Sequence, residues 1–241
     1  MWSVTLLAAV LRTFTGFGFA LILVPLLSVS MKPNDVVVLS AMLACTLGLL
    51  AWRDHWTFVN KKEFFSLVVM AAIGTLVGAR ILLVLPEDLF RVFVGLTVLV
   101  SCFILWKSDT LSLSSGSSAP WIAGTIAGLM NGLVALPGPP MIIYSLSHFT
   151  IASRSRALLT CFFTVSAAIA LLVYAGQEML RGQTAVYAAW CVPALVLGDK
   201  LGSLLFTRYG TAMYRKVALC TLATMGLVTL LQALTRLSLL S

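Results

Sequence analysis

The chain has 241 residues, of which 60% are hydrophobic and only 10% are charged, and its formal net charge is +8. A water-soluble domain carries roughly a quarter charged residues, so this composition excludes a soluble globular protein and predicts an all-α polytopic membrane protein. The basic residues are scattered among short polar stretches instead of lining one face. This distribution argues against nucleic-acid binding and favours contact with the lipid bilayer.

Apolar runs long enough to cross a bilayer follow one another along the whole chain. The Ser/Gly-rich stretch 108–119 predicts a flexible connector between a first transmembrane repeat, 1–107, and a second, 120–241. About eight segments are expected, four in each repeat, with boundaries defined to about two to four residues. They are Trp2–Val29, Val36–Trp52, Phe64–Leu85, Leu89–Trp106, Trp121–Ser147, Ala157–Ala175, Thr184–Phe206 and Met213–Leu234.

A spaced pattern recurs in the two sets of four segments. A Gly-x-x-x-Gly pair and an arginine beyond the helix end reappear at one constant interval, which predicts an internal duplication. The glycines by themselves are typical of close helix packing, so we expect them to contact helices and not a ligand. The recurring pairs are Gly74 with Gly198, Gly78 with Gly202, and Arg91 with Arg215.

Helix-breaking residues interrupt the first apolar segment of each set. Gly16, Gly18 and Pro25 break the first run, and Pro137-Gly138-Pro139-Pro140 breaks the fifth. Irregular backbone at membrane depth survives only where protein buries it or where it lines a polar cavity. Broken helices at corresponding places in two halves are typical of transport sites, although packing kinks are the alternative. Each break could kink the segment or turn it back as a re-entrant hairpin, and the sequence leaves both topologies open.

After each break a new half-helix begins, with free N–H groups and the positive end of its dipole at the gap. The amides near Gly16–Ala20 and Gly138–Ile142 therefore form a candidate anion site. Arg12 lies about one turn before the first break, where an arginine either binds substrate or extends to the interface. The candidate substrate-binding residues are Arg12, Thr15, Gly16, Phe17, Gly18, Asn131, Gly132, Pro137, Gly138, Pro139 and Tyr144.

Asp199 is an acidic residue inside the seventh apolar segment. Three interpretations stay open: it carries a coupling proton, it pairs with Arg80 at the corresponding place in the third segment, or it lies at the interface near the helix end. The two histidines, His55 and His148, lie alone without ligand spacing, so we expect no metal site. Motifs of hydrolases, metalloproteases and ATP-binding loops are absent from the sequence, which predicts neither an enzyme nor a cofactor.

These residues resemble the sulfite exporter TauE/SafE family of bacterial membrane permeases. The resemblance spans essentially the whole chain and rests on three motifs: Arg12-x-x-Thr-Gly-Phe-Gly-x-Ala20 with Pro25 after it, Asn131-Gly with Pro137-Gly-Pro-Pro, and Arg156-Ala. It implies a multi-pass permease of the bacterial inner membrane that exports or imports small sulfur-containing or organic anions, such as sulfite or sulfoacetate. A passive anion channel is the first alternative, and a membrane-embedded enzyme or assembly factor is the second. A homo-oligomer is compatible with either interpretation.

Overall fold

The structure is a computed structural model that describes residues 1–15, 18–106, 118–149, 152–205 and 208. Within these ranges every regular element is a helix, which confirms the predicted all-α class. Gly16 and Phe17 of the first break, most of the connector and the eighth predicted segment lie outside the described residues. Four of the described helices are long and apolar enough to cross a membrane, over Pro33–Trp52, Lys61–Val84, Arg154–Gly176 and Gly182–Leu205, and two shorter apolar helices cover Trp2–Thr13 and Ala119–Val134.

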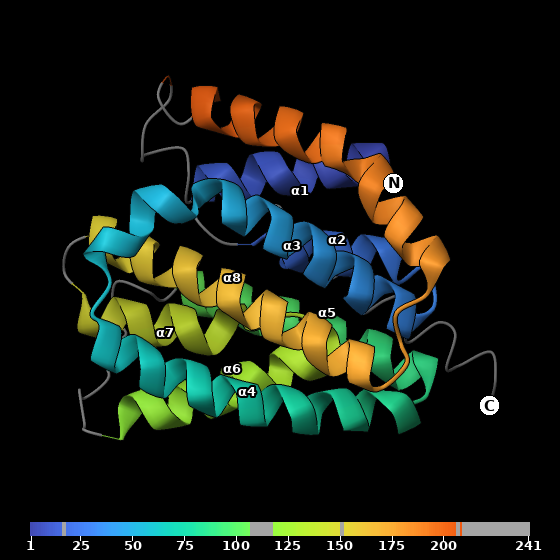
Figure 1. Ribbon diagram of the computed structural model, residues 1–241, viewed down its shortest axis with the longest axis horizontal. Helices are drawn as coiled ribbons and strands as arrows, with labels where there is room; N and C mark the ends of the chain where they lie inside the picture. The colour runs from blue at the N-terminus through green and yellow to red at the C-terminus, as the bar shows by residue number, and fades with distance from the viewer. Residues whose placement is uncertain (16–17, 107–117, 150–151, 206–207, 209–241) are drawn as a thin grey trace.

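The helices lie roughly side by side (Figure 1). The helix over Gly182–Leu205, orange in Figure 1, follows the labelled elements and lies against α1. In chain order the labelled elements are α1 (Trp2–Thr15), α2 (Phe19–Leu27), α3 (Pro33–His55), the 3-10 turn η1 (Trp56–Phe58), α4 (Lys61–Val84), α5 (Glu87–Trp106), α6 (Ala119–Val134), α7 (Gly138–His148) and α8 (Ala152–Gly176).

Local sequence explains where several of these helices begin. Pro33 stands in the first turn of α3, where a missing N–H leaves no hydrogen bond unmade. Asn60 caps α4 by accepting a hydrogen bond from the backbone N–H of Lys62 at 3.2 Å. The prolines after Gly138 likewise occupy the first turn of α7. The prolines that prevent one continuous helix through the fifth segment therefore start its second half.

Glycines allow two pairs of helices to pack backbone against backbone. A Cβ atom on Gly124 of α6 would lie 2.6 Å from the carbonyl oxygen of Leu67 in α4. A Cβ on Gly202 would lie 2.5 Å from the carbonyl oxygen of Val10 in α1. Real Cβ atoms do not approach that closely, so these contacts require glycine. The structure thus assigns the Gly-x-x-x-Gly pairs to helix packing, as the spacing predicted.

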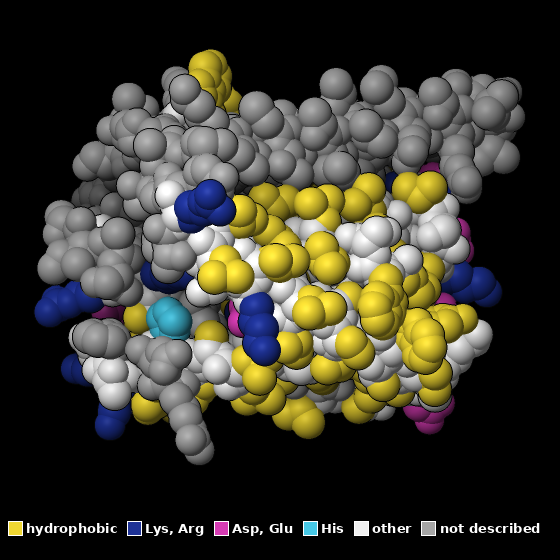
Figure 2. Space-filling model, turned by 90° about the horizontal axis from the view of Figure 1, so that it is seen from above, with side chains coloured by type: hydrophobic (Ala, Val, Ile, Leu, Met, Phe, Trp, Pro, Cys, Tyr) yellow, Lys and Arg dark blue, Asp and Glu magenta, His cyan; other side chains and the backbone are white. Residues whose placement is uncertain are grey.

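The surface of the described helices is largely apolar. Figure 2 shows apolar side chains over much of one face, with charged side chains mainly toward the two ends of the view. Phe65 and Leu172 are 70% and 74% exposed, values that are unfavourable in water and favourable against lipid acyl chains. This surface, together with the candidate spans, identifies a multi-pass membrane protein, in keeping with the predicted inner-membrane location.

The chain reverses direction at the second break. Gly124 of α6 lies against Leu67 of α4, and the later glycines of α6 meet later residues of α4, so these two helices run parallel. Tyr144, in the second half of α7, nevertheless donates a hydrogen bond to Glu63 in the first turn of α4. Helix α7 has therefore returned to the level at which α6 began. Together α6 and α7 form a re-entrant hairpin.

The first break reverses the chain in the same way. The helix over Gly182–Leu205 runs parallel to α1, because the Trp2 indole donates to the Trp190 carbonyl oxygen at 2.8 Å and the later glycines of that helix meet later residues of α1. Asp35, in the first turn of α3, accepts a hydrogen bond from Thr184 at 3.1 Å. The chain has thus returned to the level of the α1 N-terminus by the end of α2. Of the two topologies left open, the described residues adopt the re-entrant one.

The two hairpins enter from opposite ends of the molecule. The 23 residues of α3 span about 34 Å and carry the chain from the open end of the first hairpin to the start of α4. Helix α6 begins at that same level, because it runs parallel to α4. The tips of the two hairpins therefore point toward each other within the bundle.

Arg91 secures the open end of the first hairpin. Its Nε donates to the carbonyl oxygen of Ser28, just after α2, at 3.0 Å. Its terminal nitrogens pair with Asp88 at 2.9 Å and Glu87 at 3.2 Å, so the guanidinium is neutralised although it is 7% exposed. This network gives the recurring arginine a structural role in the first half; Arg215 lies outside the described residues.

Candidate functional site

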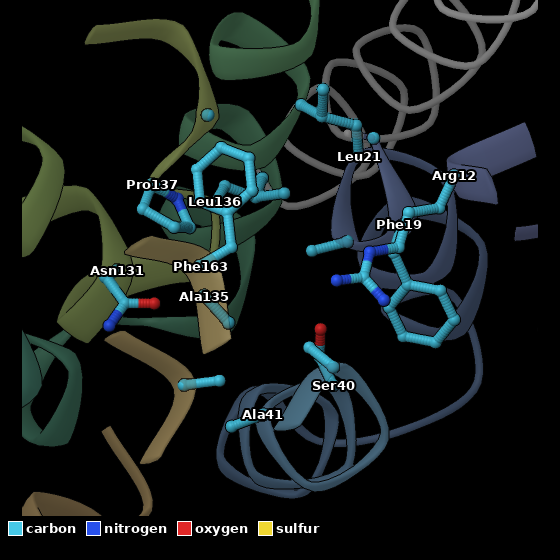
Figure 3. Close-up of a pocket in the computed structure, with 15 residues that line it drawn as sticks. Arg12, Phe19, Leu21, Ser40, Ala41, Asn131, Ala135, Leu136, Pro137 and Phe163 are labelled. Carbon is cyan, nitrogen blue, oxygen red and sulfur yellow. The ribbon is translucent and has the colours of Figure 1, made fainter. Parts of the chain in front are cut away.

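A single cavity is lined by residues from both breaks. Its volume is about 50 Å³. Because one water needs about 10–15 Å³, the cavity has room for a few waters or one small polyatomic ion. Residues from the first half that line it are Arg12, Gly18, Phe19, Ala20, Leu21, Ser40, Ala41 and Ala44, and those from the second half are Asn131, Ala135, Leu136, Pro137, Gly138, Phe163 and Ala167 (Figure 3).

The backbone at each break adopts the left-handed conformation. Gly18, which precedes α2, has a φ of 96°, where glycine carries no steric penalty. Ala135, which follows α6, has a φ of 55°, a conformation that costs a non-glycine residue on the order of 1 kcal/mol. The Ala135 N–H donates to the carbonyl oxygen of Asn131 at 2.9 Å and so ends α6. Both chain reversals thus depend on a residue held in an unusual conformation beside the cavity.

The two half-helices that follow the breaks begin at the cavity wall. Phe19, Ala20 and Leu21 form the first turn of α2, and each carries an N–H group that has no acceptor within its own helix. In the first turn of α7 only Gly138 has an N–H, since the next two residues are prolines. The positive ends of both helix dipoles favour an anion here, and α2 supplies most of the backbone donors.

Arg12 is buried in the wall of this cavity. Its side chain extends into the cavity in Figure 3, and the residue is only 7% exposed. This placement decides against the interpretation in which Arg12 extends to the membrane interface. Asp199 attracts the guanidinium and Arg156 repels it. No direct salt bridge joins Asp199 to Arg12, both of which the structure describes, so Asp199 acts on Arg12 from a longer distance.

Asp199 is held at the end of α1 beside Arg12. The Thr13 hydroxyl donates to Asp199 Oδ1 at 2.5 Å, and Arg156 donates to the Thr13 carbonyl oxygen at 2.7 Å. The suggested pairing of Asp199 with Arg80 is wrong: the Arg80 side chain is exposed on α4, and the salt bridges found among the described residues do not include it. Parallel packing of the seventh segment on α1 brings Asp199 to Thr13 instead.

Asn131 has a fixed orientation at the opposite wall. Its Nδ2 donates to the carbonyl oxygen of Ser166 at 2.9 Å and to Thr75 Oγ1 at 3.3 Å. A carbonyl oxygen can only accept, so these bonds identify the nitrogen and leave Oδ1 toward the cavity, as Figure 3 shows. The Tyr174 hydroxyl satisfies the carbonyl oxygens of Asn131 and Gly132 at the end of α6.

The structure brings five of the predicted site residues together around the cavity: Arg12, Gly18, Asn131, Pro137 and Gly138. Gly132 packs against α4, and Pro139 is buried without lining the cavity. Tyr144 lies elsewhere, because the return of α7 carries it to Glu63 and stacks it on His148 with a ring separation of 4.2 Å. Gly16, Phe17 and the side chain of Thr15 lie outside the described residues.

Several lining residues were not identified from the sequence. Phe19 and Phe163 supply apolar walls, and Ser40 supplies a hydroxyl from α3. Ser40 is the only polar residue in the apolar run Val36–Cys45, but hydroxyls in such runs commonly bond back to their own helix. Its position at the cavity depends on the packing of α3 against α2 and α8, which no local pattern encodes.

Comparison with known proteins identifies the family of this chain. The sequence model of the sulfite exporter TauE/SafE family matches residues 1–229. A curated relative from Cupriavidus necator, described as a probable sulfite/organosulfonate exporter TauE, is 27% identical over 238 residues, which cover 92% of this chain and 90% of the relative. No solved structure matches the chain significantly. The chain belongs to the sulfite exporter TauE/SafE family.

Proposed function

We propose that this protein is a secondary transporter of small anions and that its substrate binds in the cavity between the two hairpin tips. The observation that carries the proposal is the convergence of both breaks on one cavity that has the buried Arg12 in its wall. Intramembrane arginines are expensive and mark substrate pathways. The relative's description as a probable sulfite/organosulfonate exporter favours sulfite or a small organosulfonate such as sulfoacetate as the substrate.

The chemistry of the cavity suits an anion better than a cation. The Arg12 guanidinium offers five N–H donors and no acceptor, and it stays charged. The first-turn amides of α2 add neutral donors that point along a helix dipole of the same sign. An anion between these groups would offset the desolvation of Arg12, whose nearest attractive charge, Asp199, forms no direct salt bridge with it.

We further propose that the chain is built from two inverted four-segment repeats. The described contacts support this, because each hairpin packs on a glycine-bearing helix of the other half. Gly74 and Gly78 of α4 pack on α6, and Gly198 and Gly202 pack on α1. Rocking of one hairpin with its partner helix against the other would open the cavity to alternate sides of the membrane. Because each hairpin packs on a helix of the other half, the two hairpin tips are held in fixed positions relative to each other.

Counterflow in proteoliposomes tests the proposal. Vesicles loaded with unlabelled sulfite should accumulate labelled sulfite through the wild-type protein, and Arg12→Gln should reduce the initial rate by at least tenfold, since one charge-assisted contact is worth about 1.5–3 kcal/mol. Arg80→Gln is the matched control, because Arg80 is exposed on α4 and does not line the cavity. Equal rates for the two variants would refute the assignment of the site. Non-saturating flux with channel-sized currents would instead identify a passive anion channel.

A further inference from the structure

Ser40 carries a buried hydroxyl without a hydrogen-bond partner. The residue is 1% exposed, and its Oγ contacts no donor or acceptor among the described groups. Other hydroxyls in these helices behave differently: Thr46, Ser101 and Thr164 each donate to the carbonyl oxygen four residues earlier. Ser40 instead directs its oxygen into the cavity between Arg12 and Asn131 (Figure 3). A buried polar group left in this way calls for a partner, and the space beside it is the proposed substrate site.

The two ends of the cavity have opposite hydrogen-bonding character. Arg12 can only donate hydrogen bonds. Asn131 Oδ1 can only accept them, and the amide cannot turn round without losing the bond from Nδ2 to the Ser166 carbonyl oxygen. Ser40 Oγ lies between them and can do both. A ligand that offers only acceptor oxygens would place a lone pair against the lone pairs of Asn131 Oδ1, and the two acceptors would repel each other.

We propose that the cavity selects small molecules that join an anionic group to a hydrogen-bond donor, and that Ser40 is a substrate-binding residue. The anionic oxygens face Arg12 and accept a bond from Ser40 Oγ, while an O–H or N–H of the ligand donates to Asn131 Oδ1. Hydrogen sulfite, a hydroxysulfonate or an aminosulfonate has this pattern. The dianions of sulfite and sulfoacetate lack it, so the proposed substrates narrow to hydrogen sulfite and donor-bearing sulfonates. This inference rests on the proposed function and specifies the ligand of the same site.

Three small sulfonates distinguish the contribution of the hydrogen-bond donor to binding from that of the negative charge. Methanesulfonate, hydroxymethanesulfonate and aminomethanesulfonate share the anionic group and differ by a hydrogen, a hydroxyl and an amine. Calorimetric titration of the purified full-length protein should give the two donor-bearing ligands a Kd about tenfold lower than that of methanesulfonate, which corresponds to about 1.4 kcal/mol. The hydroxyl and amine ligands distinguish an O–H from an N–H donor. Equal affinities for all three would overturn the donor inference and leave the anion site standing, whereas no binding to the folded protein would overturn both.

Substitutions at Ser40 and Asn131 test whether these two residues bind the sulfonate and the donor of the ligand. Ser40→Ala should weaken all three ligands by about fivefold, because it removes a donor to the shared sulfonate. Thr5→Val is the matched control, since Thr5 is also 1% exposed with an unpartnered hydroxyl but does not line the cavity. Asn131→Leu should abolish the preference while methanesulfonate binds as well as before, and that retained binding shows that the variant is folded. If Ser40→Ala binds like Thr5→Val, or if Asn131→Leu keeps the preference, the respective assignment fails. The wild-type ligand series tests the donor inference even if Asn131→Leu does not fold.

Discussion

Gly138 offers a direct way to fill the proposed site without disturbing the fold. It begins α7 and lines the cavity. A Cβ atom at this position would lie 3.8 Å from Leu21 Cδ1 and 3.9 Å from Ile142 Cδ1, which is ordinary van der Waals contact. We therefore expect Gly138→Ala to fold normally. Because alanine has fewer unfolded conformations than glycine, the variant should gain about 0.4–1 kcal/mol of stability.

Gly138→Leu should fold but lose transport. Its side chain adds four carbon atoms, each comparable in size with a water molecule, which needs about 10–15 Å³ of cavity volume. The cavity volume of about 50 Å³ accommodates only a few waters, so leucine leaves little room for an ion. We expect counterflow of labelled sulfite to fall by at least tenfold in Gly138→Leu and by a smaller factor in Gly138→Ala.

The matched control is Gly176→Leu at the end of α8, where an added Cβ would meet nothing within 4 Å and no cavity residue is replaced. Size-exclusion profiles and thermal midpoints in detergent should be similar for the two leucine variants. If Gly138→Leu transports at the wild-type rate with an unchanged KM, the substrate does not occupy this cavity and the reasoning from its volume is refuted.

Three further predictions concern packing, anchoring and coupling. Gly202→Val should lower stability by about 1–3 kcal/mol, seen as a lower Tm in detergent, because its side chain would collide with the Val10 carbonyl of α1; an unchanged Tm would contradict the observed packing. Arg91→Met should lower stability by a similar amount by leaving the Ser28 carbonyl without its donor, and Tm values equal to wild type would show that the network contributes nothing. If Asp199 carries a coupling proton, Asp199→Asn should retain counterflow but lose accumulation driven by a pH gradient, whereas intact gradient-driven uptake would exclude that role.

Much of the architecture could be predicted from local chemistry. A scarcity of charge and recurrent apolar runs indicate membrane helices whatever their partners, because the bilayer accepts no other surface. Pro137, Pro139 and Pro140 lack the N–H that a continuing helix requires, so a break was certain at that point. Gly-x-x-x-Gly spacing likewise indicated helix packing, because glycines on one face of a helix remove the side chains that would keep two backbones apart.

Features that depend on contacts between distant parts of the chain could not be predicted from local sequence patterns. Whether a broken segment kinks or reverses is determined by what the second half-helix packs against, as the bond between Tyr144 and Glu63 illustrates. Among the three interpretations of Asp199, pairing with Arg80 fails because the helix that carries Asp199 packs on α1 and not on α4. Ser40 gains significance only through two hairpins that meet beside it. Helices and breaks follow from short-range backbone chemistry. The cavity and its polarity instead arise because residues more than 90 positions apart, such as Ser40 and Asn131, line the same space.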